Sequence, residues 1–105
     1  MKGIHSVQTV EINFEVIVMD KDTEAKLIRY IEKSTYRHRV FKTIGRGVKM
    51  PSEIADESGI LLNHISNVLN QLKEKEVAEC LNPNMKKGRL YRLSEKGLYL
   101  LDKVD

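Results

Sequence analysis

Cysteine is almost absent from this chain of 105 residues, because Cys80 is its only one. A single thiol cannot form an intrachain disulfide, so a reducing compartment is expected. The longest apolar run falls far short of the roughly 20 residues that cross a bilayer. Residues 1–10 also lack the hydrophobic core of a signal peptide. The sequence therefore predicts a cytoplasmic protein with no membrane partner.

Groups for catalysis or metal binding are also scarce. The histidines His5, His38 and His64 fall in separate predicted elements, and none is paired with a nucleophile and an orienting acid. The segment 45–47 is too short for a glycine-rich phosphate loop. One cysteine with dispersed histidines is a poor supply of metal ligands, and Cys80 fits a small buried hydrophobe better than a redox switch. We expect no enzyme, no metal site and no cofactor.

Residues 51–75 hold two short amphipathic patterns around one glycine. Pro51 suits a first helical turn, and Ile54 gives that helix an inward side. Gly59 can supply the left-handed residue that is needed where the chain reverses between two helices, and Ile60 can then enter the core. The segment predicts a helix-turn-helix, which is the arrangement that presents a helix to DNA.

The second helix of this motif is predicted to start near Asn63, whose side chain is expected to cap it. Aliphatic residues at helical spacing form its inward stripe, namely Ile65, Val68, Leu69 and Leu72. Before Lys73, mainly short polar side chains occupy its outer faces: His64, Ser66, Asn67, Asn70 and Gln71. Asn and Gln can both donate to and accept from an adenine edge. A solvated, amide-rich helix is the plain alternative, and the pattern alone does not exclude it.

A hairpin is predicted directly after this helix. Two short strands over 77–81 and 89–93 are joined by the turn-rich segment 82–88. No carboxylate lies between Glu79 and Glu95, so the hairpin is expected to project positive charge alone. Its cations are Lys86, Lys87, Arg89 and Arg92. Phosphates are the natural partners of such a hairpin.

A further helix is predicted before the helix-turn-helix. Ser34 can cap it, its apolar face holds Val40, Phe41 and Ile44, and an extended piece over 48–50 follows it. Residues 33–52 contain no carboxylate but do contain Lys33, Arg37, Arg39, Lys42, Arg46 and Lys49. One such run is most simply a solvated face. Two runs that flank a helix-turn-helix favour a phosphate-binding surface.

A helix-turn-helix followed by a basic hairpin resembles the winged-helix family of transcriptional regulators. The spacing of Ala55, Gly59, Ile65 and Val68 matches the pattern of the motif. In order, PSEIADESGI, HISNVLNQLKEKEV, CLNPNMKKGRLYRL and SEKG look like the small archaeal regulators related to the ArsR and MarR groups. The resemblance covers residues 34–97. It departs from the family at Met50, where Thr or Ser usually caps the helix.

The resemblance implies an α+β, mainly α fold, a winged helix-turn-helix with a C-terminal helix and an N-terminal strand and helix extension. Residues 1–22 would form the strand extension and 23–105 the winged helix-turn-helix domain with its flanking helices. It implies a homodimeric transcriptional regulator that binds double-stranded DNA sequence-specifically. The recognition helix, 63–75, would enter the major groove and the wing, 77–93, would lie on the backbone or minor groove. No small-molecule effector is expected.

Two sets of contacts are expected for such a complex. The residues expected to contact bases are Asn63, His64, Asn67, Asn70 and Gln71. Those expected to contact phosphates are Ser66, Lys73, Lys86, Lys87, Arg89, Arg37, Arg46 and Lys49. In this scheme phosphate contacts provide most of the affinity and amide contacts provide selection.

The N-terminal third is less determined. Apolar residues alternate with polar ones over 10–18, which predicts one strand with a buried face. Its edge needs a partner, which could be residues 4–8, the wing sheet or a second subunit. A helix with Leu27 and Ile31 on one side should follow, and a last helix, capped by Ser94, should end the chain. Either the strand extension or the last helix could form the dimer contact.

Two other functions remain open. A winged helix can also dock a protein of the transcription machinery, since fold alone does not fix function. The outer face of the recognition helix offers no large apolar or acidic anchor, which argues against docking. RNA binding is more remote, because Tyr36, Tyr91 and Tyr99 form no evident stacking platform.

Overall fold

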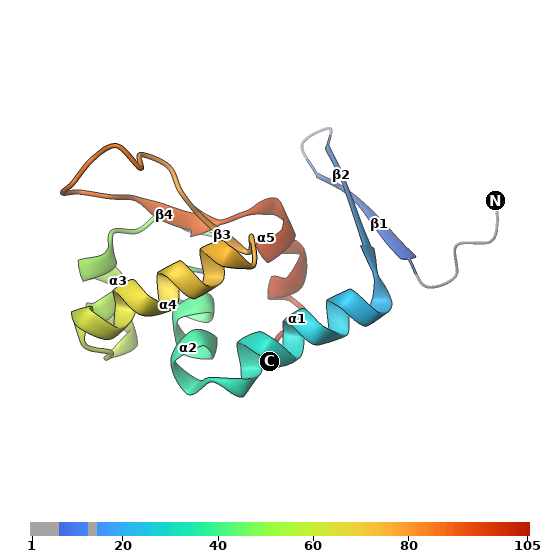
Figure 1. The fold of residues 1–105 in the computed structure, drawn as a ribbon, viewed down its shortest axis with the longest axis horizontal. Helices are drawn as coiled ribbons and strands as arrows, with labels where there is room; N and C mark the ends of the chain where they lie inside the picture. The colour runs from blue at the N-terminus through green and yellow to red at the C-terminus, as the bar shows by residue number, and fades with distance from the viewer. Residues whose placement is uncertain (1–6, 13–14) are drawn as a thin grey trace.

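The elements of the chain follow one another as a hairpin, four helices, a second hairpin and a last helix (Figure 1). The computed structural model describes residues 7–12 and 15–105, with side chains from residue 19 onward. The elements are β1 (Val7–Ile12), β2 (Glu15–Asp20), α1 (Lys21–Lys33), α2 (Thr35–Ile44), α3 (Pro51–Ser58), α4 (Leu62–Glu74), β3 (Ala78–Cys80), β4 (Tyr91–Leu93) and α5 (Glu95–Leu101). This mainly α arrangement, with an antiparallel hairpin after α4 and then a helix, is consistent with the predicted winged helix.

Short polar side chains fix the starts of three helices. The side chains of Asp20, Ser34 and Ser94 accept hydrogen bonds from backbone N–H groups in the first turns of α1, α2 and α5. The predicted caps at Ser34 and Ser94 are therefore confirmed. Gly59, with φ of 75°, ends α3 in the left-handed conformation that a β-carbon would disfavour.

The starts of the two helices of the helix-turn-helix differ from expectation. The predicted cap at Asn63 is wrong, because α4 begins earlier and Leu61 is its N-cap residue, without a side-chain hydrogen bond. The carbonyl of Leu61 already accepts from the N–H groups of His64 and Ile65, so Asn63 lies inside the first turn. At the start of α3, the Glu53 carboxylate accepts from the Met50 N–H at 2.7 Å and replaces part of the missing cap.

The strands are shorter or differently paired than predicted. The single strand over 10–18 is wrong, because β1 and β2 pair antiparallel with Ile12 opposite Glu15, so each strand has one paired edge and one open edge. His5, Phe14 and most of the expected partner segment 4–8 lie outside the described residues. The wing strands, predicted over 77–81 and 89–93, are reduced to β3 and β4. Lys49 bridges to Tyr91, which places the predicted extended piece beside the wing.

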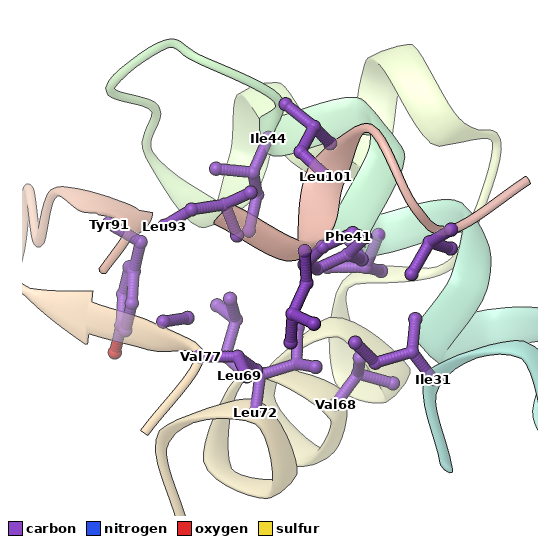
Figure 2. Packing of buried hydrophobic residues seen from close by; sticks show 14 of the residues in the cluster. Ile31, Phe41, Ile44, Val68, Leu69, Leu72, Val77, Tyr91, Leu93 and Leu101 are labelled. Atoms are coloured by element: carbon purple, nitrogen blue, oxygen red, sulfur yellow. The ribbon is translucent and has the colours of Figure 1, made fainter. Parts of the chain in front are cut away.

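One hydrophobic core joins all five helices and the wing (Figure 2). The inner side chains of α4 lie at its centre, with Ile65, Val68, Leu69 and Leu72 at most 4% exposed. Phe41 and Ile44 of α2 pack into the same cluster, as does Ile31 of α1. Each helix therefore has one buried face, and this burial determines which of its side chains point to solvent.

The last helix closes this core within a single chain. Leu100 and Leu101 of α5 are buried, and the Tyr99 hydroxyl donates to Glu24 of α1 at 2.7 Å. Burial and this hydrogen bond raise the pKa of Tyr99 to about 12, so the phenol remains a donor at ordinary pH. Among the described residues, no helix is both long and apolar enough to cross a membrane.

We predict that Gly97→Ala destabilises the protein. A β-carbon at Gly97 would overlap the carbonyl oxygen of Val77, where α5 meets the start of the wing. The backbone must shift to relieve this overlap, which should cost about 1–3 kcal/mol in free energy of unfolding. Urea denaturation measures the loss. The neighbouring Lys96→Ala removes only an exposed ion pair with Glu76 and should change stability by less than about 0.5 kcal/mol. Equal stability of the two variants would contradict the predicted close packing.

Candidate nucleic-acid interface

The outer face of α4 carries a row of carboxamides. Asn63, Asn67 and Asn70 are exposed and follow one another at helical spacing. Within the part of the chain that the structure describes, no hydrogen bond involves their side chains. Ser66 is exposed beside this row and Lys73 is half-buried. The row therefore keeps its donors and acceptors available for an external partner.

Two of the predicted base contacts lie on the flank of α4 that faces α2. The His64 ring lies 5.1 Å from the Tyr36 ring, measured between centroids. The Gln71 side-chain oxygen accepts from Arg37 Nη1 at 3.2 Å. Both His64 and Gln71 are half-buried. They are less available than the asparagine row, although they adjoin it.

Arg37 connects three helices and is itself half-buried. Its guanidinium lies 3.8 Å from the centroid of the Tyr30 ring, and its Nε donates to the Tyr30 carbonyl at 2.9 Å. With the bond to Gln71, Arg37 ties α1 and α2 to α4. Its charge is engaged by a ring and two oxygens, so it is positioned to orient α4 more than to meet a phosphate.

Internal hydrogen bonds order the wing loop between β3 and β4. The Asn82 side chain accepts from the Leu90 N–H at 2.8 Å and donates to the Gly88 carbonyl at 3.0 Å. Arg89 donates from Nε to the Met85 carbonyl at 2.6 Å and from Nη2 to the Pro83 carbonyl at 3.2 Å. Arg89 thus braces the loop from within. This role of Asn82 was not predicted from the sequence, although an asparagine at the start of a turn-rich segment commonly bonds to nearby backbone groups.

Several cations of the two acid-free segments meet carboxylates from elsewhere in the chain. Arg46 pairs with Asp102 after α5, Lys49 with Glu57 of α3, and Arg92 with Glu79 across the wing strands. The expectation that the wing projects positive charge alone is therefore wrong at its base. At its tip, Lys86 and Lys87 are exposed and form no ion pair with any described residue.

The wing tip and the helix-turn-helix lie toward the same end of the molecule. Figure 1 shows the loop after β3 extending to the end of the long axis where α3 and the start of α4 also lie. The β1–β2 hairpin lies at the opposite end, beyond α1. The wing loop, α3 and the start of α4 therefore lie together, away from the β1–β2 hairpin.

An apolar pair at the start of α4 was missed by the sequence analysis. Leu61 and Leu62 are 69% and 51% exposed. The expectation that this helix offers no large apolar anchor is thus wrong at its first turn. The run of three aliphatic residues after Gly59 could have indicated this pair, because a tight turn seldom buries three consecutive side chains. In the structure Ile60 is buried and the two leucines are exposed.

The described residues contain no cluster of three or more His, Cys, Asp or Glu side chains that could hold a metal ion. Cys80 is a half-buried free thiol whose sulfur lies 3.7 Å from Asn82 Oδ1.

No protein-family model matches the chain, and no curated protein matches its sequence.

We predict that Asn82→Ala loosens the wing while the core stays folded. The change removes the side-chain hydrogen bonds to Leu90 and Gly88, so the free energy of unfolding should fall by about 1 kcal/mol. The amide of Leu90 should exchange faster with solvent in hydrogen-exchange experiments. Asn84→Ala is the matched control, because Asn84 is exposed in the same loop. Equal exchange at Leu90 in both variants would contradict the bracing role.

Proposed function

We propose that this protein binds double-stranded DNA sequence-specifically as a winged-helix transcriptional regulator. In this proposal α4 enters the major groove and the wing lies along the backbone or the minor groove. The observation that carries it is the exposed row of Asn63, Asn67 and Asn70 on a helix whose aliphatic side chains are all buried between Ile65 and Leu72. Carboxamides in a groove can read adenine through its N6 and N7 atoms.

Charge at the wing tip supports the same proposal. Lys86 and Lys87 stand on a loop that Asn82 and Arg89 hold in shape, so their placement requires little ordering when a phosphate binds. Ser66 and Lys73 adjoin the carboxamide row and would contact the backbone beside it. We assign Arg37 and Arg89 positioning roles.

The remaining predicted phosphate contacts, Arg46 and Lys49, would have to exchange internal carboxylate partners for phosphates. The Arg46 pair with Asp102 is exposed, so its exchange would cost little. Exposed carboxylates on α3 argue against a phosphate contact near that helix, because they repel phosphates. Asp56 and Glu57 lie on that helix, so we place the DNA against α4 and the wing, with α3 farther from the phosphates.

A second candidate function is docking to a protein of the transcription machinery. The exposed Leu61 and Leu62 favour it, because large apolar side chains anchor protein interfaces. The carboxamide row and the wing lysines favour DNA. The two candidates differ in an observable way, since binding to DNA phosphates depends steeply on salt, whereas docking through two leucines would depend on it weakly.

We predict different effects for substitutions in α4 and in the wing. A pool of randomised 20-base-pair duplexes is first selected with the protein, and the enriched duplex is compared with a scrambled one by fluorescence anisotropy. Asn67→Ala should weaken binding to the enriched duplex by about 5- to 150-fold and to the scrambled duplex much less, because a base contact is lost. Lys87→Ala should weaken both alike and reduce the salt slope by about one.

Lys26→Ala is the matched control for charge, because Lys26 pairs with Asp22 on α1. The affinity of the Lys26→Ala variant for both duplexes, and its salt slope, should equal those of the wild type. Equal losses on both duplexes for Asn67→Ala would remove Asn67 from the base-reading set. Failure of the pool to enrich, with no salt-dependent binding, would contradict the DNA-binding function itself.

We further propose that the protein acts as a homodimer joined through the β1–β2 hairpin. An isolated two-stranded hairpin is only marginally stable in water, so additional pairing would stabilise it. The alternative contact, α5, already buries Leu100 and Leu101 in its own chain. The hairpin also lies at the end of the molecule away from the wing tip (Figure 1).

We predict that removal of residues 1–18 converts a dimer to a monomer. This truncation keeps Met19, which is buried, and Asp20, which caps α1, so the rest of the fold should persist. Analytical ultracentrifugation measures the change in mass, and circular dichroism verifies the helices. A truncated protein that remains dimeric would exclude the hairpin as the contact.

A further inference from the structure

Two neighbouring leucines project into solvent where the recognition helix begins. Leu61 is 69% exposed and is the most exposed large hydrophobic residue among those whose side chains the structure describes. Leu62, which follows it, is 51% exposed. Single exposed leucines are common on protein surfaces. An adjacent pair at the first turn of the helix that faces a partner calls for a separate explanation.

Leu61 departs from the capping found at the starts of the other described helices. The N-cap residues of α1, α2 and α5 are Asp20, Ser34 and Ser94, and each accepts a hydrogen bond through its side chain. At α3, whose N-cap is Met50, the Glu53 carboxylate accepts from the Met50 N–H instead. At α4 the N-cap is Leu61, which cannot accept one. Natural sequences break such local rules mainly at functional sites. Leu61 provides no cap and leaves most of its side chain in solvent, so an external contact explains it better.

The backbone that carries the two leucines is firmly held. Ile60, just before them, is 4% exposed in the core, and its N–H donates to the Ser58 hydroxyl at 3.3 Å. The carbonyl of Leu61 accepts from the N–H groups of His64 and Ile65 at 3.0 and 3.2 Å. The leucines are therefore fixed relative to Asn63, the first member of the carboxamide row, and do not sit on a loose loop.

We propose that Leu61 and Leu62 are specificity residues that contact the C5-methyl groups of thymines, so that the DNA site is rich in A·T pairs where α4 enters the groove. Thymine is the only standard base with a methyl group in the major groove, and apolar side chains read it by contact. Asparagine reads adenine in the same groove. In an A·T pair, the leucines would therefore contact the thymine and the asparagines the adenine of the other strand. The inference rests on the proposed DNA-binding function.

A protein partner fits these leucines less well. A specific protein interface buries at least about 1,000 Å², and two leucine side chains supply only a small part of that area. The next exposed residues along α4 are Asn63, Ser66 and Asn67, all polar. Small apolar contacts set among hydrogen-bonding side chains match base edges, where a methyl group lies next to donors and acceptors.

The test replaces thymine by uracil, which lacks only the methyl group. The duplex enriched from the randomised pool is synthesised with thymidine or with deoxyuridine at each A·T pair, one position at a time, and affinities are measured by anisotropy. For the wild type, uracil should weaken binding by about fourfold at each contacted position, the effect of burying one methyl group. In Leu61→Ser and Leu62→Gln the ratio of thymine to uracil affinity should fall toward one at the corresponding position.

Stability measurements separate this effect from loss of folding. Serine is a good N-cap residue, so Leu61→Ser should raise the melting temperature, by about 4 °C, while it lowers affinity for the thymine duplex. Val48→Ser is the matched control, because Val48 is 48% exposed in the loop before α3. It should keep the thymine-to-uracil ratio of the wild type.

Three results would overturn the inference. A wild-type ratio of one at every position, with tight binding to the enriched duplex, would leave the DNA-binding function standing and remove the methyl contacts; a protein partner for the leucines corresponds to this outcome. An enriched duplex without A·T pairs would do the same. Failure of the pool to enrich any duplex would reject the proposed function, and this inference with it.

Discussion

The burial of one side of α4 is the constraint on which the rest of the structure depends. Ile65 and Leu72 are fully buried and Leu69 is 1% exposed, so the rotation of this helix about its axis is fixed by the core. A turn of the helix that brought Asn67 inward would bury an unpaired carboxamide and expose leucine, both of which are unfavourable. The outward direction of Asn63, Asn67 and Asn70 is therefore a consequence of packing.

Much of the remaining polar chemistry serves to hold elements in place. Arg37 bonds to Tyr30 and Gln71, and Arg89 bonds to the wing loop. Because these two guanidinium groups are bonded within the chain, they are less available to an external partner. They instead fix the orientation of α4 and of the wing loop, which carry the exposed side chains. The molecule thus divides its cations between those that define the shape of the surface and those, such as Lys86 and Lys87, that remain at its outside.

The local features of this fold could be predicted from the sequence because they depend on local spacing. The buried stripe of α4, the glycine turn and the caps at Ser34 and Ser94 depend on residues within a few positions of one another. The partners of Arg46 and Lys49 could not be predicted from local spacing, because Asp102 lies far along the chain and Glu57 lies in the next helix, α3. Leu61 was missed for another reason. Asn63 is a better N-cap residue by type than Leu61, but the helix begins earlier, at Leu62.

The division of cations also bears on how a DNA-binding function would work. Phosphate contacts supply affinity without selection, and each exposed cation adds to binding on any sequence. With Arg46, Lys49 and Arg92 paired internally, fewer charges are left for that nonspecific term than the acid-free segments imply. Discrimination then depends more on the side chains that meet base edges. In the proposed function, a small protein whose formal charge is only +3 would favour one DNA site over others without a large basic surface, because the geometry of α4 would carry the selection.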